Sequence, residues 1–233
     1  MKKTILLIFA ILLSTSFSCQ NSEKQTELTV INILGAKVYE KPTYDSKTLK
    51  KLPVGETIKI DQQIESNEKN EIGKEFSLVG KWIKPKNNNG FIFSSDLTDK
   101  EVEIGTDEFG KVFIDLRGKL TDEKTEEEQM ETPMGKFPKY FEYKYYESGN
   151  YTYIEWDGCF DHIYKYEKLS LNEVYHQMVS DYSILMNRNE ISIPSFLEKD
   201  DNILKFEGRG ATQDLTIENN ENGLITVSSY DCT

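Results

Sequence analysis

Apolar and polar residues alternate with the period of a β-strand through much of the chain. Between residues 57 and 60, for example, Ile58 and Ile60 fall on one side and Lys59 on the other. Similar short segments follow one another up to about residue 97, separated by turns that contain Pro, Gly or Asn. Closely spaced short strands predict a small all-β barrel for residues 28–98.

Strand-like alternation returns in the second half of the chain. Residues 139–168 alternate Tyr, Phe and Ile with polar residues, and the breaks at 147–150 and 157–158 predict a three-stranded meander. A strand is expected before it, at 110–120. Further strands are expected after residue 190, and the last two form a hairpin that turns at Asn222-Gly223.

One segment follows the period of a helix instead. Apolar residues recur at helical spacing over 171–187, and Ser170 followed by Glu173 has the spacing of a capping box. A single helix on an antiparallel sheet predicts an α+β domain for residues 99–233. The whole chain is therefore expected to be mostly β, with a small SH3-like barrel followed by this α+β domain.

The acidic run at 121–131 has no apolar periodicity, so we expect an exposed loop there. Its spacing does not match the oxygen ligands and glycine of an EF-hand loop, so no calcium site is predicted.

The first nineteen residues are a basic head, an apolar run over Thr4–Leu13 and a small-residue segment that ends at Cys19. The apolar run is too short for a mature membrane span, which needs about 20 residues, and the pattern is typical of a secretion signal. The segment Phe17-Ser18-Cys19 resembles the lipobox of bacterial lipoproteins; a plain signal peptide with an incidental cysteine is the alternative. The resemblance implies a signal peptide at 1–18, a lipid on Cys19 and a polar tether at 19–27.

A second resemblance covers residues 28–98. Its residues, in order, are Val38-Tyr39, Lys41-Pro42, residues 49–55, residues 80–84 with Trp82, and residues 90–97. This order resembles the bacterial SH3 domain. The resemblance implies an SH3-like barrel that engages peptidoglycan or a wall-associated protein, with Tyr39, Tyr44 and Trp82 as candidate ligand-binding residues. The alternative for Trp82 is a place in the barrel core.

Charge divides the chain at about residue 100. The 233 residues carry a formal net charge of −12. Residues 28–97 contain 11 basic and 9 acidic residues, whereas residues 99–233 contain 14 basic and 29 acidic ones, a net charge of −15. An acidic unit of this size repels phosphates, so nucleic acid is not an expected partner.

Cys159 and His162 lie within the segment 157–162 and raise the possibility of a cell-wall cysteine peptidase. The surrounding carboxylates would raise the pKa of the thiol, and no second histidine follows at a suitable place. In an oxidising compartment the two cysteines left after lipidation, Cys159 and Cys232, are expected to form a disulfide, with a free structural thiol as the alternative. Two histidines without a CxxC or HExxH motif predict no metal and no cofactor.

These features predict a non-enzymatic binding protein of a bacterial cell envelope, held to a membrane by its lipid. That membrane would be the outer one in a cell with two. The alternative function is inhibition or sequestration of a cationic protein, such as a lysozyme-like wall hydrolase, by the acidic domain. A wall peptidase is the remote alternative.

Overall fold

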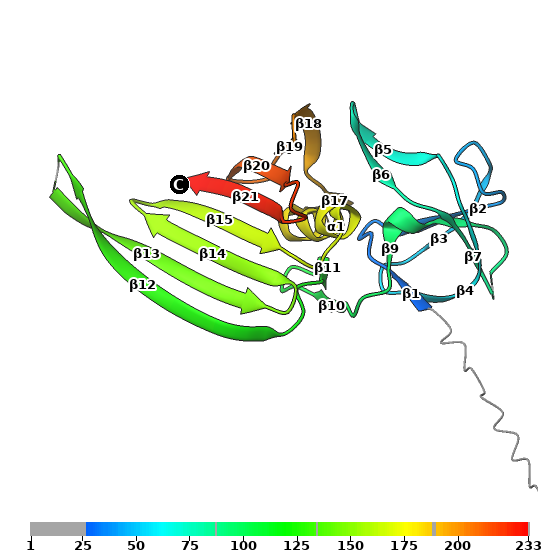
Figure 1. Cartoon of the computed structure of the whole chain (residues 1–233), viewed down its shortest axis with the longest axis horizontal. Helices are drawn as coiled ribbons and strands as arrows, with labels where there is room; N and C mark the ends of the chain where they lie inside the picture. Colours follow the sequence, from blue (N-terminus) through cyan, green and yellow to red (C-terminus); the bar gives the residue numbers. More distant parts are fainter. Residues whose placement is uncertain (1–26, 87, 134, 188–189, 233) are drawn as a thin grey trace, which may run out of the picture.

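The computed structural model describes residues 27–86, 88–133, 135–187 and 190–232. Cys19 and the predicted signal peptide and tether up to residue 26 lie outside them. Strands dominate the described part, which contains one α-helix, and every strand pairing within it is antiparallel (Figure 1). The mostly β class is confirmed. The part of the chain that the structure describes holds no helix with the length and hydropathy needed to cross a bilayer.

The N-terminal region builds three small sheets. Strands β8, β7, β4, β1 and β9 form one sheet in that order, while β2–β3 and β5–β6 form two-stranded ribbons. The bounds are β1 Glu27–Val30, β2 Ala36–Tyr39, β3 Thr48–Leu52, β4 Thr57–Ile64, β5 Lys69–Gly73, β6 Phe76–Val79, β7 Trp82–Pro85, β8 Ile92–Phe93, the 3₁₀ helix η1 Ser94–Asp96, and β9 Leu97–Thr98.

The predicted small barrel is not closed. Among the described residues, β2 meets the end of the β7–β8 hairpin only through the bridge between Tyr39 and Phe91, whose backbone hydrogen bonds are 2.7 and 2.8 Å long. The ribbon β5–β6 lies in the long link between β4 and β7 and contributes to a different core. The N-terminal strands therefore form open antiparallel sheets.

The C-terminal region is built on one eight-stranded sheet in the order β12-β13-β14-β15-β21-β20-β19-β18. Two further ribbons, β10–β11 and β16–β17, form separate two-stranded sheets. The bounds are β10 Glu103–Thr106, β11 Val112–Asp115, β12 Leu120–Thr132, β13 Gly135–Tyr146, β14 Gly149–Trp156, β15 Cys159–Tyr166, α1 Leu171–Tyr182, β16 Ile184–Asn187, β17 Glu190–Ser192, β18 Ser195–Asp200, β19 Ile203–Glu207, β20 Thr212–Asn219 and β21 Ile225–Cys232.

The predicted meander is confirmed as β13–β15, and the final hairpin turns at Gly223 with a φ of +82°. The acidic run, however, is not a loop. It is the 13-residue strand β12, paired with β13 from Thr132 to Leu120. Its residues are nearly all exposed because neither side of the strand is covered, so burial imposes no apolar alternation on it.

The helix α1 begins as predicted and ends five residues early. The Ser170 hydroxyl accepts from the Glu173 backbone N–H, and the Glu173 carboxylate accepts from the Ser170 N–H, completing the capping box. At the other end, Lys111 Nζ donates to the carbonyl oxygens of Ser180 and Ser183, each at 2.9 Å. A cation at that position stabilises the last turn.

One buried cluster joins the two regions. It contains Ile31 and Ile33 from the link between β1 and β2 and Phe76 and Leu78 from β6, together with residues of α1, β11, β19, β20 and β21. Polar contacts cross the same boundary: Thr98 Oγ1 donates to Glu173 at 2.6 Å, and His176 Nε2 lies 3.0 Å from the Ser95 carbonyl oxygen. In Figure 1, α1 accordingly lies between the N-terminal strands and the large sheet.

Candidate binding site

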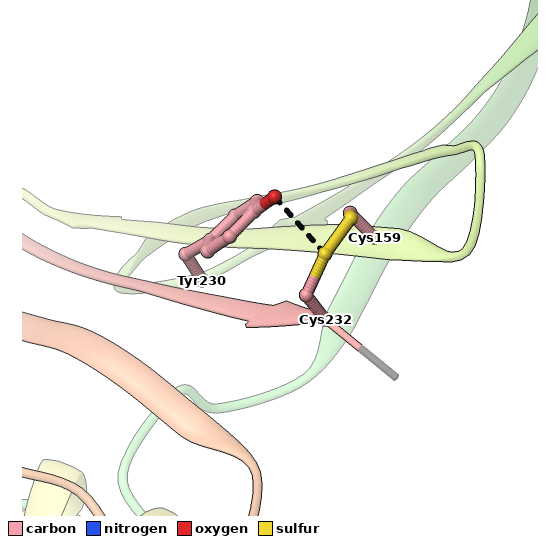
Figure 2. The surroundings of a disulfide bond; sticks show 3 residues. All are labelled: Cys159, Tyr230 and Cys232. Carbon is pink, nitrogen blue, oxygen red and sulfur yellow. Dashed lines mark hydrogen bonds between the residues drawn. A yellow bond between two sulfur atoms is a disulfide. The ribbon is translucent and has the colours of Figure 1, made fainter.

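The two cysteines predicted to pair form a disulfide. Cys159 and Cys232 are directly opposite each other on the neighbouring strands β15 and β21, with Cα atoms 4.2 Å apart. The Tyr230 hydroxyl contacts the Cys232 sulfur at 3.2 Å (Figure 2). While its sulfur is bonded to Cys232, Cys159 provides no thiolate nucleophile for a peptidase.

The structure also brings together the three aromatic residues predicted to bind a ligand. The rings of Tyr39, Tyr44 and Trp82 lie 5.1–5.6 Å apart. Trp82 is only 1% exposed, and its indole N–H donates to the Glu68 carboxylate at 2.8 Å. Burial raises the pKa of Tyr44 above its ordinary range. The cluster is closed by its own packing and presents little ring surface to solvent.

The register of the eight-stranded sheet separates two faces. Every buried residue of its strands points to the side that packs against α1, which we call the helix face. These residues are Tyr166, Leu204, Phe206, Leu215, Ile217, Ile225, Val227 and Ser229. The other side, which we call the open face, carries no buried residue among the described positions and includes the disulfide.

The helix face continues beyond the end of α1 onto β14 and β15, where its residues are mostly aromatic. Tyr151 stacks on Tyr164 with ring centroids 4.5 Å apart, and Tyr153 stacks on Phe160 at 5.9 Å. His162 lies between these pairs, directly opposite Tyr153. Cross-strand pairing of large rings stabilises this uncovered part of the sheet.

Carboxylates surround these rings on the same face. Glu142 is opposite Tyr153, Glu155 is opposite Phe160, and Asp231 is opposite Phe160 on the other side. Glu123, Glu127 and Glu131 extend the acidic surface along β12, where Glu127 is opposite Tyr140. The lysines of this part of the face, Lys136 and Lys144, are bonded to Glu131 and Glu142.

A cavity of about 280 Å³ lies where this acidic, aromatic surface meets the end of α1. His162, Tyr164 and Asp231 line it from the sheet, and Asp181 and Tyr182 line it from the helix. Burial raises the pKa of both Tyr164 and Tyr182, so their hydroxyls stay neutral near pH 7. The Tyr182 hydroxyl is bonded to Ser229 Oγ at 2.9 Å, which ties the helix end to the sheet.

The two carboxylates of the cavity have different surroundings. Asp181 accepts from Arg117 at 3.1 Å and from the Gln177 amide at 3.0 Å, and burial raises its pKa to about 6 despite the nearby guanidinium. Asp231 Oδ2 lies 3.5 Å from His162 Nε2, whereas its Oδ1 is buried without a hydrogen-bond partner. His162 Nδ1 is in turn 2.8 Å from the Tyr151 hydroxyl.

From the sequence, His162 was considered only beside Cys159, and the proximity of His162 and Asp231 was not predicted. They are 69 positions apart and meet only because β15 and β21 are adjacent. The predicted disulfide carried the missing signal: strands cross-linked at Cys159 and Cys232 must bring the neighbouring residues of both segments together.

Comparison of the chain with protein-family models, with curated proteins and with solved structures found no match. The likenesses to the lipoprotein lipobox and to the bacterial SH3 domain therefore stay predictions from the residues.

Proposed function

We propose that this chain is a lipid-anchored, non-enzymatic binding protein of a bacterial cell envelope that captures a cationic protein on its C-terminal sheet. The observation that carries the proposal is the acidic and aromatic surface of the helix face beyond α1. Carboxylates without a lysine ion pair stand beside partly exposed rings there, with Glu127 opposite the exposed Tyr140 and Glu155 bonded to the Tyr153 hydroxyl.

Charge complementarity defines the partner. Residues 99–233 carry a net charge of −15, which draws a basic protein toward the sheet and repels acidic ones. The tyrosine rings add apolar contact area and faces on which lysine and arginine side chains stack. The protein already shows this chemistry within its own fold: the Arg117 guanidinium lies 5.4 Å over the ring of Tyr164 on the helix face and 3.1 Å from Asp181, and Lys124 Nζ lies 4.5 Å over the ring of Tyr143 on the open face.

We assign the binding surface to this sheet and not to the cluster of Tyr39, Tyr44 and Trp82, because the latter is closed by packing. A contact between residues 28–98 and peptidoglycan is a separate prediction. Retention of the full chain on purified peptidoglycan tests it, and absence of retention removes it.

A basic lysozyme serves as the first probe of the proposed function. The full chain, purified in mild detergent, is titrated with lysozyme at low salt and again at high salt. Binding is expected at low salt and should weaken at least tenfold at about 1 M, where the screening length falls to about 3 Å. Lysozyme with acetylated lysines is the control and should bind poorly. Absence of binding at low salt, or equal binding of the acetylated form, contradicts the proposal.

A further inference from the structure

We propose that the cavity beside the end of α1 receives a lysine or arginine side chain of the cationic partner. The inference rests on the proposed function and names the place where that partner is anchored. The cavity is lined by Asp231, His162 and Tyr164 from the sheet and by Asp181 and Tyr182 from the helix.

The size of the cavity favours a single side chain. Pockets that hold drug-sized molecules measure about 300–1,000 Å³, and this one measures about 280 Å³. It lies at the edge of the uncovered aromatic surface, so a side chain that enters it extends from a protein already lying on the sheet. Anchors of this kind, in which one long side chain fills a pocket, dominate the energetics of many interfaces.

Asp231 supplies the acceptor. Its side chain lines the cavity and is 23% exposed as a whole, so an incoming cation reaches the exposed part of the carboxylate, whereas Oδ1 itself is buried without a partner. A carboxylate with one undonated oxygen is costly to bury, and a guanidinium or ammonium group at its exposed part supplies a charge-assisted hydrogen bond to the same carboxylate.

The other charged groups that line the cavity already have partners within the protein. Asp181 is paired with Arg117. Arg209, which also lines the cavity, donates to the Ile193 carbonyl at 2.9 Å and to Ser195 Oγ at 2.7 Å. Its third nitrogen lies 3.5 Å from the Glu207 carboxylate, so the guanidinium is held by Glu207, Ile193 and Ser195 and its charge is paired within the protein. This leaves Asp231 as the carboxylate that an incoming cation meets.

The disulfide holds this acceptor in place. Asp231 is the neighbour of Cys232 near the end of β21, and Cys159 pins that strand end to β15, two positions from Asp161 and three from His162. Asp231 and the disulfide point to opposite faces, so the cross-link fixes the strand without obstructing the cavity.

A second copy of the chain does not fit this site. Two molecules that each carry a net charge of −12 repel, and residues 99–233, which form the cavity, are the more acidic part of each. The occupant is instead a basic side chain on a protein of opposite charge.

Proton NMR of the histidine rings tests the inference, because the chain has two histidines. His162 lines the cavity, and His176 is buried at the junction with η1 and serves as the internal control. The full chain is titrated with a tri-arginine peptide. We expect the His162 ring signals to shift in a saturable way while those of His176 stay in place.

Two variants with equal charge change locate the acceptor. Asp231→Asn is expected to weaken the peptide about tenfold, as loss of one charge-assisted hydrogen bond implies. Asp161→Asn changes a carboxylate on the open face, opposite Tyr230, and should alter the affinity less than twofold.

The inference is overturned if saturating tri-arginine leaves the His162 signals unmoved, or if both variants weaken binding equally. If Asp231→Asn misfolds, the tri-arginine titration of the wild type still tests the inference. If lysozyme binds but tri-arginine does not shift the His162 ring signals, only the assignment of the cavity as the anchor site fails. If tri-arginine moves His162 while lysozyme does not bind at low salt, the proposed function fails instead.

Discussion

At the scale of single residues, the disulfide ties the end of the chain to the middle of the large sheet. Cys159 and Cys232 are 73 positions apart, and closing a loop of that length restricts the unfolded chain strongly. We expect Cys159→Ala to lower the free energy of unfolding by about 2–5 kcal/mol in urea titrations. Mild reduction should destabilise the wild type similarly and leave the variant unchanged. A loss below about 0.5 kcal/mol would show that the bridge contributes little.

Asp181 gives the fold a defined response to pH. Its carboxyl pKa is raised by burial from an ordinary 3.8 to about 6, so the folded protein binds more protons than the unfolded chain between those values. Stability from this group therefore falls as pH rises from about 4 to 6, by roughly 3 kcal/mol in all. Asp181→Asn should remove this slope.

Urea midpoints at several pH values, compared between wild type and Asp181→Asn, measure that difference directly. Parallel curves for the two proteins from pH 4 to 6 would mean that the Arg117 guanidinium balances the burial of Asp181 completely.

The individual residues of the site were only partly predictable from the sequence. The pairing of Cys159 with Cys232 was predicted from an oxidising compartment and from the two cysteines that remain after lipidation of Cys19. The unpartnered oxygen of Asp231 did not, because it depends on which face of β21 the residue occupies and on where α1 ends. Both are properties of the tertiary arrangement.

At the scale of elements, α1 begins at a capping box whose contribution is measurable. Ser170→Ala removes the hydroxyl that accepts from Glu173 N–H and should lower the free energy of unfolding by about 1 kcal/mol. The matched control is Ser77→Ala, whose hydroxyl donates to the exposed Glu71 and should cost less than half as much. Equal effects of the two changes on the urea midpoint would contradict the role of the cap.

Elements with one buried side were predicted from the sequence. The strand whose two sides both face solvent was not. The strands β13–β15 and the helix start left clear patterns because apolar spacing or a cap marks them. The strand β12 left none, since both its sides face solvent and its pairing with β13 is made by the backbone. The apolar spacing of the helix runs on past its end, because Ser183 is extended and the next residues pair as β16 with β17, which the local pattern does not reveal.

At the scale of the whole molecule, the two regions share one core, so we expect them to unfold together. The chain has two tryptophans, Trp82 in the N-terminal sheets and Trp156 in the large sheet. The variant Trp156→Phe keeps Trp82, whose fluorescence reports on the N-terminal sheets. The variant Trp82→Phe keeps Trp156, whose fluorescence reports on the large sheet. Within each variant, the fluorescence and circular dichroism transitions should coincide in urea. Separate transitions, with the N-terminal probe melting apart from the sheet, would show that the contacts of Phe76 and Leu78 with the shared cluster are weak.

Over β12–β15 and β21 the helix face carries six carboxylates and two lysines, whereas the open face carries four carboxylates and three lysines. The central claim is that a cationic protein binds the helix face of these strands. The most direct test compares two triple variants that remove three carboxylates each. The helix-face variant is Glu123→Gln with Glu127→Gln and Glu155→Gln. The open-face variant is Asp122→Asn with Glu128→Gln and Asp161→Asn.

The measurement is the dissociation constant for basic lysozyme at about 0.1 M salt, where the screening length of about 10 Å allows the two faces to be distinguished. We predict that the helix-face variant binds at least tenfold more weakly than wild type, while the open-face variant stays within about threefold. Equal weakening by both variants would show that net charge alone attracts lysozyme, and would contradict a binding surface on the helix face.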